Sequence, residues 1–421
     1  MTEEKPRRSR AWKILVGLII SVAAAAVGVA LWIASVAAHR WEAMEQSIRR
    51  LEYEILARPG DRPVLTGIAE PGNAWEDYAK ALDVPLAHGD LLRNFLQGRS
   101  GSPADQAILK TVLSDPAGIL GDLHRGAHRA VAKQLPRERQ DWIEESLLDL
   151  ALLAASRSKA LAEEGKGREA SETLLDLAQF SRDTGVDVPS IECGASPRIC
   201  DMALGGLLEL DLGGKLTRED RLAVAEALGR LDSSWSDRVL LEDVDVVQIG
   251  RGLLQSWHLY AEVHSTMTKT GGEASFWIGW RYGFSDRLIA ADAFEQLLEA
   301  SKGMSAARRS PRPECLKAAS EALSALMESR NPYLSANCYR FLHGVGSAQE
   351  RARIRLLRVA LHYRATGEIL DLEDPFGGRL RHEVQGSRFK VWSVGPDGVD
   401  HGGIGGWSSP SALDIVLEVE R

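Results

Sequence analysis

Residues 14–38 form a run of 25 residues that contains no charged side chain. As a helix rising ~1.5 Å per residue, the run is roughly 37 Å long, enough to cross a hydrocarbon core of ~30 Å with some tilt. Trp12 and Trp32 lie near its two ends, where amphipathic rings favour the membrane interface. The sequence therefore predicts one transmembrane helix over residues 14–38.

The short tail ahead of this run sets its predicted orientation. Residues 1–13 carry five basic and two acidic side chains, a net charge of +3. Basic residues ahead of a span keep that end in the cytoplasm. We therefore expect a cytoplasmic tail, a single pass through the inner (cytoplasmic) membrane and a periplasmic C-terminal domain. The alternative is a signal peptide cleaved after Val36-Ala37-Ala38, although signal-peptide apolar cores run only ~7–15 residues.

Composition narrows the classes of function. The chain of 421 residues has a net charge of −8, which leaves −11 for the part after residue 13. This thinly spread acidity argues against nucleic acid as a partner. The sequence contains no nucleophile elbow, phosphate-binding loop or dinucleotide fingerprint. It therefore favours a protein without enzymatic activity, and a hydrolase assembled from scattered residues is the alternative.

Residues 39–58 are expected to continue the helix beyond the membrane. Apolar side chains recur there at steps of three and four, a seam of two heptads. The seam consists of Trp41, Met44, Ile48, Leu51 and Ile55. Two interpretations are open: the seam packs on the protein's own body, or it forms a parallel homodimer through residues 41–55.

Residues 59–366 are predicted to form a helical domain built as an irregular array of helical hairpins. A buried helix that ends near Ala162 is followed by a Gly165-Lys166-Gly167 turn and a second helix over residues 168–183. Thr217 is a good N-cap for a later helix. Further helices are expected at 199–212, 217–231, 237–264, 286–302, 314–329 and 347–366.

Four cysteines follow the apolar run: Cys193, Cys200, Cys315 and Cys338. Disulfides persist outside the cytoplasm. Of the three possible pairings, the sequence favours the local one, Cys193 with Cys200 and Cys315 with Cys338. A zinc site is the rival interpretation, but the spacing lacks a Cys-x-x-Cys pair.

The periodicity changes to that of strands in the last part of the chain. A hairpin is predicted from strands at 379–385 and 388–394, joined by a tight turn at Gly386-Ser387. A last strand is expected at 414–419. The predicted fold class is thus mainly α, with an N-terminal transmembrane helix, an irregular helical-hairpin array and a small C-terminal antiparallel β-module over residues 367–421.

That module resembles the C-terminal part of the pseudopilins of type II secretion. The motifs that carry the resemblance are Asp374-Pro375-Phe376-Gly377, Ser393-Val394-Gly395-Pro396-Asp397-Gly398 and Asp414-Ile415-Val416. The resemblance implies a calcium site, because the major pseudopilins bind calcium in this loop through aspartates and carbonyls. The matching candidates are Asp397, Asp400 and Asp414, whose oxygen ligands suit calcium. The alternative is a turn in which Asp397-Gly398 supplies only backbone geometry.

The resemblance also implies a pseudopilus-associated component as an alternative function, although the N-terminus lacks a prepilin signal. The Gly72-Asn73-Ala74-Trp75 segment, the helical pairs and the DPF…SVGPDG ending together resemble uncharacterised membrane-anchored proteins of Gram-negative bacteria. The leading expectation is a non-enzymatic, membrane-anchored envelope protein that acts as a helical scaffold for a protein partner. No cofactor other than calcium is expected.

His124 and His128 are four residues apart and therefore share one face of a helix. Such a pair can ligate a metal ion. However, Arg125 stands where a metalloprotease helix has its glutamate, so the sequence favours two surface histidines.

Overall fold

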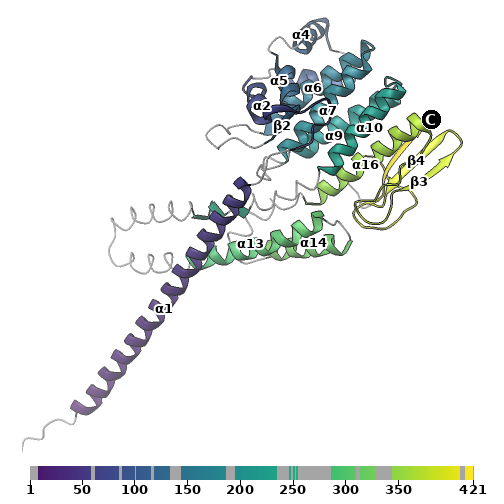
Figure 1. Ribbon diagram of the computed structural model, residues 1–421. Coiled ribbons are helices and arrows are strands. Elements are labelled where there is room, and N and C mark those ends of the chain that lie inside the picture. Colours follow the sequence, from purple (N-terminus) through teal and green to yellow (C-terminus); the bar gives the residue numbers. More distant parts are fainter. Residues whose placement is uncertain are drawn as a thin grey trace, which may run out of the picture.

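A computed structural model of the chain describes residues 8–57, 62–84, 88–99, 101–114, 118–132, 144–185, 195–234, 246–247, 250–251, 253–254, 286–309, 313–328, 344–407 and 413–420. Helices dominate this part of the chain, and a small antiparallel sheet lies near its end, which confirms the predicted fold class (Figure 1). The elements are α1 Arg8–Ala57, β1 Glu70–Asn73, α2 Ala74–Leu82, α3 Gly89–Leu96, α4 Pro103–Leu113, α5 Ile119–Ala127, β2 Arg129–Val131, α6 Glu144–Glu163, α7 Gly167–Thr184, α9 Ala195–Leu212, α10 Arg218–Ser233, α13 Asp286–Arg309, α14 Pro313–Glu328, α16 Gly344–Thr366, β3 Arg381–Gln385, β4 Arg388–Ser393 and β5 Ile415–Glu420.

The long helix α1 has two halves in different surroundings (Figure 1). The first half projects away from the body and exposes its apolar side chains, for example Trp12 at 65% and Trp32 at 67%. Among the described residues, α1 is the helix long and apolar enough to cross a membrane. A signal sequence near the N-terminus can also meet this criterion of length and composition, so we treat retention and orientation of the helix as a proposal below.

The second half of α1 belongs to the folded body. Met44 and Ile48 are only 3% and 2% exposed, and they pack with Phe294 and Leu297 of α13. Trp41 and Leu51 are partly buried against the same cluster, so the chain itself covers part of the heptad seam, as the first of the two interpretations expects. A homodimer through residues 41–55 stays a prediction.

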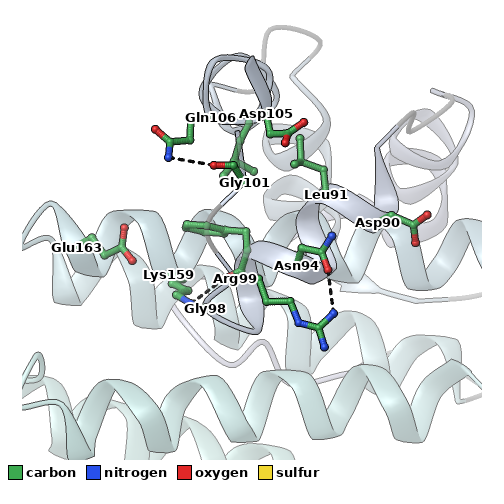
Figure 2. Close-up of a pocket in the computed structure, with 12 residues that line it drawn as sticks. Asp90, Leu91, Asn94, Gly98, Arg99, Gly101, Asp105, Gln106, Lys159 and Glu163 are labelled. Atoms are coloured by element: carbon green, nitrogen blue, oxygen red, sulfur yellow. Dashed lines mark hydrogen bonds between the residues drawn. The ribbon is translucent and has the colours of Figure 1, made fainter. Parts of the chain in front are cut away.

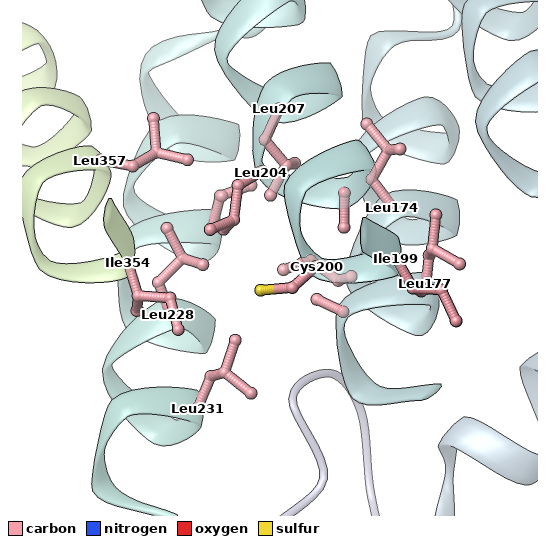
Figure 3. Close-up of a cluster of buried hydrophobic side chains, with 14 of the residues drawn as sticks. Leu174, Leu177, Ile199, Cys200, Leu204, Leu207, Leu228, Leu231, Ile354 and Leu357 are labelled. Atoms are coloured by element: carbon pink, nitrogen blue, oxygen red, sulfur yellow. The ribbon is translucent and has the colours of Figure 1, made fainter. Parts of the chain in front are cut away.

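The main core is formed by α-hairpins, as the sequence predicted. The hairpin of α6 and α7 matches the expected bounds within a residue or two. Its turn requires glycine, because a Cβ on Gly167 would lie 2.0 Å from the carbonyl oxygen of Lys215. Helices α7, α9, α10 and α16 then enclose fully buried leucines such as Leu204 and Leu228 (Figure 3). Thr217 caps α10 in a capping box with Asp220.

The C-terminal sheet has the order β3-β4-β5, with all neighbours antiparallel. Gly386 adopts a φ of +62° in the hairpin turn, where glycine is favoured. The inner face packs on α16, and the ring of Phe389 stacks on Tyr363 at a centroid distance of 4.1 Å. The sheet therefore shares one hydrophobic core with the helices rather than forming a core of its own.

A short parallel pair of strands, β1 and β2, was not predicted. Both strands are too short to show an alternating pattern, and β1 contains Pro71 and Gly72. The pair places the segment before α2 beside the end of α5: the N–H of Glu70 donates to the carbonyl oxygen of His128 at 2.8 Å. The helix expected at 237–264 lies largely outside the described residues.

Candidate metal centre, groove and C-terminal loop

Helices α5 and α7 bring two histidines and an aspartate together. His128 is the C-cap of α5, and its N–H donates to the carbonyl oxygen of His124 at 3.2 Å. Their one-turn spacing places the two rings on one side, with centroids 4.3 Å apart. Asp176 projects from the middle of α7, where it is almost fully buried.

Both imidazoles turn a ring nitrogen toward the Asp176 carboxylate. Nδ1 of His124 lies 2.7 Å from Oδ2 of Asp176, and Nε2 of His128 lies 3.5 Å from Oδ1. The hydroxyl of Thr66 lies 3.1 Å from Nε2 of His128. The ligand atoms of His124, His128 and Asp176 all lie within 4.8 Å of one another. Within the described part of the chain, this is the cluster of three such side chains that could hold a metal ion.

The sequence-based interpretation of these residues as surface histidines is only half correct. The His124 side chain is 57% exposed, whereas that of His128 is 13% exposed. The hydrogen bond to Asp176 raises the pKa of His124, burial opposes this shift, and the negative charge of Asp176 adds to it. The interpretation failed because Asp176 comes from another helix, 52 residues after His124.

A buried ionic network lies beside this cluster. Asp183, about two helical turns after Asp176 on α7, accepts a hydrogen bond from the Tyr78 hydroxyl at 2.8 Å. Nη1 of Arg62 lies 2.9 Å from the same carboxylate, and both side chains are completely buried. Nη2 of Arg62 donates to the carbonyl oxygen of Gly126 at 2.6 Å. Burial and the Asp183 charge raise the pKa of Tyr78 well above its usual value, so the phenol stays protonated.

A cavity of about 790 Å³ opens between α3, α4 and α6 (Figure 2). Its lining combines apolar side chains with both signs of charge. Nζ of Lys159 donates to the carbonyl oxygens of Phe95 and Leu96 and thereby caps the end of α3. A neighbouring cavity of about 400 Å³ over α6 and α9 shares Lys159 and Glu163 with the first. The two cavities thus adjoin along α6, and together they are called the α6 groove.

The predicted calcium ligands lie in one loop region, but their carboxylate oxygens do not all come within 4.8 Å of one another. Backbone N–H groups of the loop donate to Asp397, Asp400 and Asp414 at 2.7–3.3 Å. The indole of Trp392 also donates to Asp400 at 3.0 Å. The His401 ring lies between Asp397 and Asp414, 3.8 and 3.6 Å from their oxygens. Calcium takes six to eight oxygen ligands, and its binding in this loop stays a prediction.

Asp374 has a role that the motif alone did not reveal. Its carboxylate accepts hydrogen bonds from the N–H groups of Phe376 and Val394 and from the hydroxyl of Ser393, at 2.7–3.0 Å. These bonds tie the turn after α16 to the end of β4. The first two of the three motifs that carry the pseudopilin resemblance are therefore joined by hydrogen bonds in this structure.

The disulfide prediction stays open. Cys200 is fully buried in α9, and its sulfur points toward Leu228 and Leu231 of α10 (Figure 3). Cys193, Cys338 and the side chain of Cys315 lie outside the described residues. The described structure therefore neither pairs nor separates the four cysteines.

Comparison of the chain with protein-family models, characterised proteins and solved structures found no match. The geometry described above is therefore the basis for assigning a function.

Proposed function

We propose that this chain is a non-enzymatic protein of the inner membrane, anchored by residues 14–38, whose periplasmic body is a scaffold for another envelope protein. The proposal rests on the different surroundings of the two halves of α1, of which the first is exposed and the second is packed on α13. Its first half leaves a row of apolar side chains uncovered, and burial of apolar surface is worth roughly 25 cal/mol per Å². A lipid bilayer would bury these apolar side chains. The basic residues of the N-terminal tail favour a cytoplasmic N-terminus.

The continuity of α1 supports a scaffold held close to the membrane. The same helix that leaves the body contributes Met44 and Ile48 to a buried cluster with α13. Arg40 and Glu295 form an ion pair at 2.6 Å on the same side. The anchor is thus packed on the body rather than joined by a free linker, which fixes the height of the helical body above the bilayer.

The α6 groove is the surface that we assign to the partner. Leu91 and Leu109 provide apolar contacts, while Asp105, Lys159 and Glu163 supply both signs of charge along its length. A partner segment with an apolar side flanked by mixed charges fits this chemistry. Pockets that combine apolar walls with a few polar groups are the usual form of a binding site.

Membrane topology tests the anchor. We expect a reporter enzyme that is active only in the periplasm to be active when fused to the C-terminus. An N-terminal tag should remain on the 46.0 kDa chain, and the chain should stay in the membrane after an alkaline wash. A variant that lacks residues 14–38 is the control and should stay in the cytoplasm. Loss of the tag from the mature protein would show a cleaved signal peptide instead.

Site-specific crosslinking tests the scaffold function. A photoreactive amino acid at Leu91 or Leu109 should give one discrete adduct in living cells. The same group at Val384, an exposed apolar position on β3, is the matched control and should give none. The adduct at Leu109 should disappear when Leu91 is replaced by aspartate. Equal adducts at all three positions would contradict the assignment of the groove.

The alternative of a pseudopilus-associated component rests on the hydrogen-bonded Asp374 unit and its motif residues. Deletion of the gene should abolish type II secretion if this alternative holds, and normal secretion would remove it.

The alternative of a hydrolase is favoured by one observation, the convergence of His124, His128 and Asp176.

A further inference from the structure

We infer that His124, His128 and Asp176 form a binding site for a divalent transition-metal ion, with zinc as the representative ion. This inference does not depend on the scaffold function. Imidazole nitrogens and carboxylate oxygens are the ligands that zinc and its first-row neighbours take in proteins. All three side chains offer such an atom, and these atoms lie within 4.8 Å of one another between α5 and α7.

The separations of the ligand atoms suit a small tetrahedral ion. With bonds of ~2.0–2.2 Å, a tetrahedral zinc holds its ligand atoms about 3.3–3.6 Å apart. Nε2 of His128 and Oδ1 of Asp176 are already 3.5 Å apart. Nδ1 of His124 lies beside the other oxygen of the same carboxylate, Oδ2, at the 2.7 Å of a hydrogen bond. The His124 ring is half exposed, so it can move outward by less than about 1 Å to admit the ion.

The less exposed ligands are held in place by their surroundings. Asp176 is nearly buried in the middle of an 18-residue helix. A Cβ on Gly67 would lie 3.1 Å from Cε1 of His128, so the backbone at Gly67 packs against that ring. Gly67 has a φ of +64°, where side chains are disfavoured. Positions fixed in this way reduce the reorganisation that metal binding needs.

Three protein ligands leave one tetrahedral position for a further ligand. Sites with three protein ligands and an open fourth position are typical of catalytic zinc, whereas structural zinc usually has four protein ligands. The Thr66 hydroxyl, 3.1 Å from Nε2 of His128, lies beside the cluster and can hydrogen-bond to a water in that position. The exposed ring of His124 gives solvent access to the ion.

Metal titration of the full chain in detergent tests the inference. After removal of metal with a chelator, we expect dialysis against zinc to load one ion per chain at this site. Cobalt should give the strong visible absorption of a four-coordinate ion. Asp176→Asn and His124→Ala should each weaken zinc binding more than about 100-fold, since loss of an outer-shell partner alone costs 10–100-fold.

Two matched variants serve as controls. Glu172→Gln removes a carboxylate one turn away on α7, and His382→Ala removes an exposed histidine on β3; neither should change zinc binding. If Asp176→Asn fails to fold, His124→Ala decides, because that side chain is half exposed. A chain that loads no zinc would overturn the inference. Zinc binding that survives both ligand variants would also overturn it, because the ion would then lie elsewhere, for example on cysteines.

Discussion

Replacing Asp183 by alanine should be among the most damaging single changes in this protein. The carboxylate faces Arg62, and both side chains are completely buried. It also accepts the Tyr78 hydroxyl at 2.8 Å and Nη1 of Arg182 at 3.1 Å. Removing it leaves an uncompensated guanidinium without access to water.

The magnitude follows from this burial. Breaking a buried ion pair by removing one partner costs about 3–5 kcal/mol in the free energy of unfolding. Tyr78→Phe removes a single hydrogen bond to a charged acceptor and should cost roughly 1.5–3 kcal/mol. The phenol in the Asp183→Ala chain has already lost that acceptor. The double variant should therefore cost little more than Asp183→Ala alone.

Denaturant unfolding of the full chain in detergent, followed by circular dichroism, measures these differences. Glu226→Ala is the control, because Glu226 and Arg230 form an exposed pair at 2.7 Å, which is worth about 0.3–0.5 kcal/mol. A cost below ~1 kcal/mol for Asp183→Ala would refute the reasoning, because it would mean that water reaches Arg62. Additive costs in the double variant would show that Tyr78 and Asp183 act independently.

Three further outcomes are expected. Burial raises the pKa of Asp77, but hydrogen bonds from Arg129 and Lys80 outweigh it and leave the pKa lowered. The stability that Asp77 contributes is therefore present above the unfolded pKa of ~3.9 and is lost as the pH falls through the lower folded value. Asp77→Asn should reduce stability by roughly 1–3 kcal/mol at neutral pH and flatten the acid limb of the melting-temperature profile. If the C-terminal loop binds calcium, free calcium at 100 times the dissociation constant should stabilise the fold by about 2.7 kcal/mol and raise the melting temperature. Asp397→Ala should abolish this rise. Identical melting curves with calcium and with chelator would show that the loop is only a turn. Thiol labelling of the denatured, unreduced protein should find no free cysteine if both disulfides form, and labelling of all four would place the body in the cytoplasm.

Local signals in the sequence predicted most of the architecture. Some signals determine only the structure of their immediate neighbours in the chain, so they can be read from a single sequence. Examples are the apolar run, the glycines between α6 and α7, and the Thr217 cap. The C-terminal hairpin was predicted in the same way from its alternation around Gly386. The β1–β2 pair was missed because its strands are joined only in space.

The candidate metal centre, in contrast, could not be predicted in full from local sequence signals. The sequence places His124 and His128 on one helical face, but it does not say which helix that face meets. Gly126, between them, gives part of the answer: a Cβ there would lie 2.2 Å from a ring carbon of Tyr78, so only glycine lets α5 approach α2 so closely. Tyr78 is in turn bound to α7 through Asp183. The glycine therefore permits the packing that carries both histidines to Asp176, and a pattern of His-Arg-Gly-Ala-His holds more information about the site than the histidine spacing alone.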